Sequence, residues 1–185
     1  MVAAFQTEWD FGGTANTPGT VETVLTNLRF NNEDTNDQDA ASPVTIPTGA
    51  DVFSFWKQIY LACRTTAPDN LINNVKIWTD ASGLAWTGCT VNVQDDVLAH
   101  STAGDAGYDP GQALVMTTHD TVTSVTDLFT YVTATPRAVT ISETTSQIDA
   151  IGEFTDYVCL SLTVSSSAVQ GTQATETITW RYDES

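Results

Sequence analysis

The fold is decided by the stretch Val52-Phe-Ser-Phe-Trp-Lys-Gln-Ile-Tyr-Leu-Ala-Cys-Arg64, which is followed after a turn-like gap by Asn73-Asn-Val-Lys-Ile-Trp-Thr-Asp80. The first half is apolar at nearly every position, which is the pattern of a strand covered on both faces. The second half alternates, so one face should be buried and the face that carries Lys76 and Trp78 should not. We expect this pair of strands to form the middle of a β-sandwich.

The remaining sequence favours a single all-β domain. With 185 residues the chain is long enough for one full core, and its abundant Thr suits the solvated faces of strands. The clearest alternation runs from Phe154 to Ser165. The prediction is a single antiparallel β-sandwich, jelly-roll-like, with about eight to nine strands. Residues 1–20 are expected to form an extended N-terminal arm, and residues 21–185 the sandwich domain.

The charge balance is strongly acidic, with 23 acidic and 6 basic residues and a net charge of −17. Such a surface repels nucleic acid and anionic membranes, so neither is expected as a partner. An acidic surface with few lysines also stays hydrated in concentrated salt, which suggests a halophilic source. Cation binding and simple solubility are the alternative explanations of the charge.

The sequence contains no catalytic motif that we recognise. The two histidines, His100 and His119, lie in no nucleophile or metal-ligand context, and the P-loop and zinc-protease patterns are absent. Paired carboxylates for glycoside hydrolysis stay open, because such pairs are formed in space and not in sequence. We therefore expect a protein that is not an enzyme.

Calcium is the one cofactor that the sequence raises, and no other cofactor is expected. The candidate ligands are Asp34, Asn36, Asp37 and Asp39. They supply hard oxygen ligands within six residues, but they do not follow the EF-hand spacing, because Asp39 stands where that loop needs Gly. A second, weaker set consists of Asp95, Asp96, Asp105 and Asp109. A solvated acidic loop is the alternative for both sets.

Several aromatic residues are candidates for contact with a partner. Trp9 and Phe11 on the expected arm would be costly if exposed, so they should dock on the domain body or on a neighbouring subunit. Tyr108 and Asp109 lie in the long loop 95–111, and loops of this length are often functional. Trp78 could serve a carbohydrate site or pack against a subunit.

The three cysteines, Cys63, Cys89 and Cys159, lack the spacing of zinc or redox motifs. Each lies in a strand-like run, so buried free thiols are expected, with one disulfide as the alternative. The N-terminal residues contain no basic region followed by a long apolar run, so no signal peptide is expected. The protein should therefore fold in a cytosol.

Three segments carry a family resemblance: Phe53-Ser-Phe-Trp-Lys57, Ile72-Asn-Asn-Val-Lys-Ile-Trp-Thr-Asp-Ala-Ser-Gly83 and Gly171-Thr-Gln-Ala-Thr-Glu-Thr-Ile-Thr-Trp-Arg-Tyr-Asp-Glu184. Together they resemble small β-sandwich virion proteins of tailed phages and archaeal head-tailed viruses. The resemblance implies a capsid-associated protein of the decoration, cement or turret type. It implies a homo-trimer or homo-pentamer on the major capsid protein, located on the virion after assembly in the host cytoplasm. It transfers no site residues.

The alternative function is a carbohydrate- or receptor-binding β-sandwich module, such as a tail, fibre or lectin-like protein. It would present exposed aromatic rings beside Asp or Asn in one groove.

Overall fold

The structure is a computed structural model that describes residues 4–14, 17–22, 27–33, 43–80, 82–95, 99–101, 104–105, 124–171 and 173–185. These residues form twelve strands and one short 3-10 helix, η1. The elements are β1 (Ala4–Thr14), β2 (Thr17–Glu22), β3 (Val52–Phe53), β4 (Lys57–Thr66), β5 (Ile72–Thr79), β6 (Cys89–Gln94), β7 (His100–Ser101), β8 (Gly104–Asp105), β9 (Val125–Asp127), η1 (Leu128–Thr130), β10 (Arg137–Ala138), β11 (Val158–Val164) and β12 (Ile178–Glu184).

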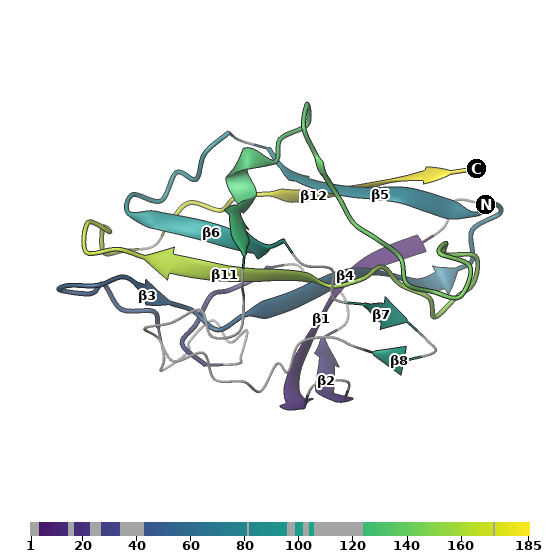
Figure 1. Cartoon of the computed structure of the whole chain (residues 1–185), viewed down its shortest axis with the longest axis horizontal. Coiled ribbons are helices and arrows are strands. Elements are labelled where there is room, and N and C mark those ends of the chain that lie inside the picture. Colours follow the sequence, from purple (N-terminus) through teal and green to yellow (C-terminus); the bar gives the residue numbers. More distant parts are fainter. Residues whose placement is uncertain are drawn as a thin grey trace.

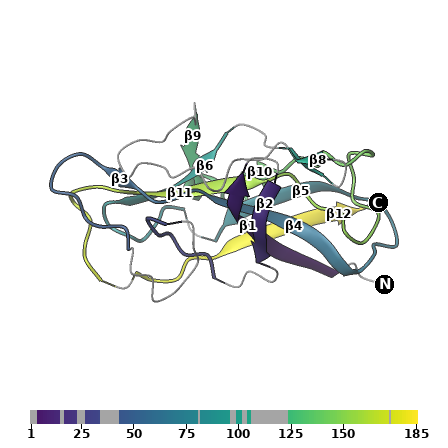
Figure 2. The ribbon, with the colours of Figure 1, turned by 90° about the horizontal axis from the view of Figure 1, so that it is seen from below.

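The strands form two main antiparallel sheets (Figure 1). The large sheet has the order β2-β1-β4-β11-β6-β9, with β3 also paired to β11, and the small sheet has the order β10-β5-β12. Strands β7 and β8 pair separately. In both views of the ribbon β5 and β12 run side by side (Figures 1 and 2). The predicted all-β antiparallel sandwich is confirmed, while its jelly-roll-like character stays a prediction.

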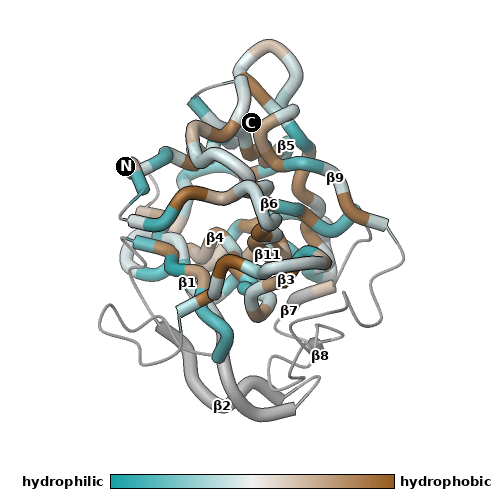
Figure 3. The backbone as a smooth tube through the Cα atoms, turned by 90° about the vertical axis from the view of Figure 1, so that its left-hand side faces the viewer, coloured by the Kyte–Doolittle hydropathy of each residue, from teal (hydrophilic) through white to brown (hydrophobic). Residues whose placement is uncertain are grey.

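The main core lies between the two sheets. Ile59 and Leu61 of β4 and Leu160 of β11 meet Val75 and Ile77 of β5 there, and all five side chains are buried. The tube view along the sandwich shows the apolar segments of β4, β6 and β11 gathered near the centre (Figure 3). Burial of these side chains removes apolar surface from water, which is the dominant favourable term in folding.

A second cluster lies on the opposite face of the large sheet. It contains Trp56, Tyr60, Ala62, Tyr157 and Cys159, all buried. The central strand β4 therefore has both faces covered, as its unbroken apolar sequence predicts. On β5 the predicted alternation is also confirmed, because the side chains on one face are buried and those on the other are partly or fully exposed.

The N-terminal segment is part of the large sheet. Strand β1 pairs with β4 on one side and with β2 on the other. Trp9 is only 1% exposed and belongs to the main core. Of the two positions left open for Trp9, the structure shows docking on the domain's own body. Residues 4–14 and 17–22 thus form strands in the segment where the sequence suggested an arm, and the indole ring of Trp9 is buried in the main core.

Other strand boundaries differ from the expected ones. The alternation from Val21 to Phe30 predicts a strand there. Val21 and Glu22 lie in β2, residues 23–26 lie outside the described part, and Leu28 and Phe30 pack on the core from an irregular segment.

The run Ala138-Val-Thr-Ile-Ser142 after Pro136 also predicts a strand, but in the structure the strand is limited to Arg137–Ala138. The sequence Leu128-Phe-Thr-Tyr-Val132 is compatible with a strand or with a short helical turn, and the structure has the 3-10 turn η1 there. The apolar run Ala113-Leu-Val-Met-Thr-Thr118 predicts a further strand, and these residues lie outside the described part of the chain.

Candidate functional site

Most of the residues proposed from the sequence lie outside the described part of the chain. These are Asp34, Asn36, Asp37, Asp39, Tyr108 and Asp109. The backbone of Phe11 lies in β1, but its side chain is outside the described part. Trp9 is a core residue, so its side chain is not available to a partner. Among the described residues, no three His, Cys, Asp or Glu side chains are grouped so that they could hold a metal ion.

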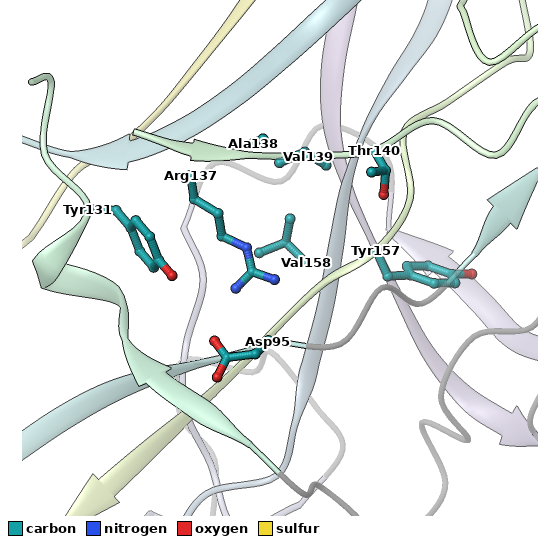
Figure 4. Close-up of a pocket in the computed structure, with 8 residues that line it drawn as sticks. All are labelled: Asp95, Tyr131, Arg137, Ala138, Val139, Thr140, Tyr157 and Val158. Atoms are coloured by element: carbon teal, nitrogen blue, oxygen red, sulfur yellow. The ribbon is translucent and has the colours of Figure 1, made fainter. Parts of the chain in front are cut away.

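A pocket of about 170 Å³ opens at the edge of the sandwich, between the end of β6 and strand β10. Its polar groups come from Asp95, Tyr131, Arg137 and Thr140 (Figure 4). Arg137 pairs with Ile77 of β5, whose side chain is fully buried, so Arg137 starts from the inward-facing side of the small sheet. Its guanidinium group points across the pocket towards Asp95 (Figure 4). The pairing of β10 with β5 thus places the cationic side chain of Arg137 on the side that faces the pocket.

The Asp95 carboxylate is held in place by two hydroxyl groups. Ser124 Oγ donates to Oδ2 at 2.5 Å, and Thr126 Oγ1 donates to Oδ1 at 2.7 Å. The hydrogen bond from Ser124 is the main reason why the pKa of Asp95 lies below its ordinary value. Burial opposes this effect, and the bond from Thr126 and the positive charge of Arg137 lower the pKa further. Asp95 is therefore ionised at neutral pH and fixed in orientation.

The guanidinium group of Arg137 is less completely hydrogen-bonded than the Asp95 carboxylate within the described residues. Its Nη1 atom is buried and makes no hydrogen bond to any described residue. The guanidinium carbon lies 6.0 Å from the centre of the Tyr131 ring, which is at the outer limit of a cation–π contact. A buried charged donor without an acceptor is unfavourable, so the pocket holds unused hydrogen-bonding capacity.

In a second carboxylate–guanidinium pair, Glu8 and Arg64, the two groups are hydrogen-bonded directly to each other. Glu8 of β1 is fully buried, and it accepts hydrogen bonds from Nε of Arg64 at 2.6 Å and from its Nη2. The hydrogen bond to Glu8 is the main reason why the pKa of Arg64 is raised. Lys57, which lies in β4 like Arg64, is fully buried with its Nζ 4.3 Å from the centre of the Trp9 ring. These groups stabilise the β1–β4 pairing and lie away from the pocket.

The outer face of the small sheet carries a basic and aromatic patch. Lys76 and Trp78 point outward from β5, and their partners across the strand are Arg181 and Thr179 of β12. Lys76 and Trp78 are partly exposed, and the side chain of Arg181 is 56% exposed. Arg181 makes an exposed ion pair with Asp183 at 3.5 Å. We call Lys76, Trp78, Thr179 and Arg181 the outer face.

A wider groove of about 1170 Å³ opens between the sheets. Its apolar lining includes Leu28, Phe30, Trp86 and Trp180. These side chains pack on the core from a partly exposed position.

The three cysteines are free thiols. Cys63 and Cys159 are buried and Cys89 is partly buried, so the expectation of buried thiols is confirmed for the first two. Burial raises the pKa of both Cys63 and Cys89, and for Cys63 the charge of Glu153 adds to this effect. A raised pKa lowers the fraction of reactive thiolate at neutral pH.

Comparisons with known proteins identify no relative: no family model, no curated protein and no solved structure matches the chain. Within the described residues, no helix is long and apolar enough to cross a membrane.

The sequence analysis missed the role of Arg137 and placed Asp95 only among weak calcium ligands. The signal for Arg137 is its rarity, because it is one of only six basic residues in the chain.

Proposed function

We propose that the chain is a non-enzymatic virion structural protein, which decorates or stabilises a capsid by symmetric self-association and by docking on the major capsid protein. The resemblance to small capsid-associated sandwich proteins supports this role. Two of the three resembling segments contain β5 and β12, which pair in the small sheet. These segments therefore build the sheet that carries the outer face.

The outer face is the observation that carries the proposal. It holds two of the six basic residues, Lys76 and Arg181, in directly paired positions beside Trp78. Lys57 and Arg64 are used inside the chain, by Trp9 and Glu8 respectively. A basic and aromatic surface on a chain of net charge −17 is complementary to the acidic surface of another copy. Tryptophan and arginine are also enriched where protein interfaces are strongest.

The occupant that we assign to the outer face is a second copy of this chain. A contact between two different surfaces repeats around a ring, and rings of three or five subunits would match the symmetry of capsid positions. The remaining acidic surface would stay outside the contact and keep the assembly soluble.

Native mass at micromolar concentration tests the self-association. We expect a trimer or pentamer for the natural chain and a monomer for the double variant Lys76→Gln/Arg181→Gln. The matched control is Thr48→Glu/Ser166→Glu, which lowers the net charge by the same amount at two exposed positions away from the outer face. A monomeric natural chain, or equal assembly of both double variants, would contradict the proposed interface.

The genes beside the coding sequence test the virion role itself. Adjacent genes for a major capsid protein, a portal and a terminase are expected. Particles purified from the same source should contain the chain in a fixed ratio to the major capsid protein. Absence of the chain from such particles would overturn the virion role even if the chain forms a ring.

Salt dependence tests the halophilic origin. Concentrated KCl screens repulsion among the acidic side chains, so the thermal unfolding temperature should rise between 0.1 M and 2 M KCl, where the screening length falls from about 10 Å to below about 3 Å. An unfolding temperature independent of KCl would argue for a source at ordinary salt.

A further inference from the structure

The proposed virion role does not account for the pocket at the edge of the sandwich. We propose that it binds a small, neutral, hydroxyl-rich ligand, namely a sugar unit, between Asp95 and Arg137. This inference depends on the geometry of the pocket and holds whether or not the chain is part of a virion.

Two oppositely charged side chains face each other across the pocket. Arg137 faces Asp95 from the opposite wall without forming an ion pair with it (Figure 4). The buried Nη1 atom of Arg137 makes no hydrogen bond to a described residue. A ligand group that accepts a hydrogen bond would satisfy this donor.

The carboxylate oxygens of Asp95 have acceptor positions left for a ligand. Each oxygen of Asp95 receives one hydrogen bond from a hydroxyl group, of Ser124 or of Thr126. A carboxylate offers about four lone-pair positions, so each oxygen can accept a further hydrogen bond. The two existing bonds hold the carboxylate in a fixed orientation, which reduces the entropy lost when a ligand binds.

The opposite charges of Asp95 and Arg137 disfavour a charged ligand. An anion that pairs with Arg137 would face the negative charge of Asp95, and a cation that pairs with Asp95 would face the positive charge of Arg137. A neutral group that donates to Asp95 and accepts from Arg137 avoids both conflicts. A hydroxyl group does both, and two neighbouring hydroxyl groups of a sugar can reach both charged residues at once.

The volume and the lining of the pocket suit a small organic ligand. Its volume of about 170 Å³ is roughly tenfold the volume that a single ordered water requires, so one water does not fill it. The Tyr131 ring stands beside Arg137 and supplies an apolar wall, while Val139 and Val158 line the floor. A few polar groups on an apolar wall are typical of small-molecule sites, and the C–H face of a sugar ring could lie on the ring of Tyr131.

The test is a titration of the full chain with single sugars, followed by NMR of isotopically labelled protein. The panel is glucose, galactose, mannose, N-acetylglucosamine and N-acetylneuraminic acid, with acetate, acetamide and methylammonium as non-sugar probes. We expect at least one neutral sugar to shift the resonances of Tyr131 and Thr140 in a saturable way. A glycan array then extends the search to longer chains.

Two variants locate the site, each with a control of equal charge change. Arg137→Gln is compared with Ser166→Glu, and Asp95→Asn with Asp51→Asn, because both control positions are exposed and outside the pocket. Each pocket variant should weaken sugar binding at least tenfold, and each control should leave it unchanged. Thr140→Phe, at an exposed position on the rim, should block binding without altering the charged groups.

Several results would overturn the inference. These are no saturable binding of any sugar on the panel or the array, equal binding by the pocket variants and their controls, and tighter binding of acetate, methylammonium or the negatively charged sugar than of every neutral sugar. Binding of acetamide without binding of any sugar would assign the pocket to a carboxamide side chain of a protein partner instead. Thermal unfolding of each variant confirms that a loss of binding is not a loss of the fold.

Discussion

Two carboxylate–guanidinium pairs in this molecule combine the same chemical groups in opposite surroundings. Glu8 is fully buried and accepts two hydrogen bonds from Arg64. Asp95 is exposed and accepts hydrogen bonds from two hydroxyl groups, while Arg137 faces it with a buried nitrogen that has no acceptor among the described residues. The first pair is complete within the chain, so its role is structural. The second has hydrogen-bonding capacity left over, so it defines a site.

The largest effect on the free energy of unfolding should come from breaking the Glu8–Arg64 pair. Arg64→Met leaves the Glu8 carboxylate buried and without its guanidinium partner, which typically costs about 3–5 kcal/mol in the free energy of unfolding. Urea denaturation at fixed salt measures it. The double variant Glu8→Leu/Arg64→Met should recover most of the loss, because an apolar pair removes the buried charge. A single variant as stable as the natural chain would show that Glu8 is not held by Arg64.

The next effect concerns how ionised Asp95, which faces Arg137, contributes to the stability of the fold as the pH falls. The pKa of Asp95 is lower in the folded chain than its ordinary value of 3.8. Ionised Asp95 therefore stabilises the fold above pH 3.8, and this contribution disappears as the pH falls through the lower pKa of the folded state. Asp95→Asn should be less stable than the natural chain at pH 7, and the difference should vanish in strong acid. Thermal unfolding between pH 2.5 and 7 measures it, with Asp51→Asn as the control.

Removal of the cation from the Asp95–Arg137 pair should have a smaller effect than removal of Arg64. Arg137→Met deletes a guanidinium group whose buried Nη1 has no hydrogen-bond partner within the described ranges, so little is lost and a desolvation cost is relieved. We expect a change within about 1 kcal/mol in the free energy of unfolding. A loss as large as that of Arg64→Met in the same urea experiment would mean that Arg137 is a structural residue, and would remove the contrast between the two pairs.

The smallest effect is expected for the exposed pair Arg181–Asp183. Both side chains are largely exposed, and such pairs contribute about 0–1 kcal/mol because water and salt screen them. Arg181→Gln should therefore leave the unfolding free energy of the monomer nearly unchanged. Measurement below the concentration at which the chain associates separates this effect from the loss of self-association.

The sequence predicted the fold where one strand has a clear pattern of its own. The unbroken apolar run of β4 and the alternation of β5 identified a strand buried on both faces and a strand buried on one. Trp9 was harder to place, because β1 is polar apart from its aromatic residues, and its burial depends on β4, about fifty residues later.

The pocket could not be predicted in the same way. Asp95 and Arg137 are far apart in the sequence, and they face each other only because β10 pairs with β5 and β6 pairs with β9. Strand β10 is two residues long, so it has no periodicity to detect. The calcium hypothesis for Asp34, Asn36, Asp37 and Asp39 concerns residues outside the described part of the chain, and it stays a prediction.

The position of β4 also affects how the protein is made. Gln58 of β4 pairs with Cys159 of β11, which comes 101 residues later. At a synthesis rate of about 5–20 residues per second, roughly 5 to 20 seconds pass before β11 leaves the ribosome. During that interval one edge of β4 and its two apolar faces lack their final cover. The nascent chain is therefore a natural client for chaperones that shield apolar strands, and slow synthesis would lengthen its exposure to aggregation.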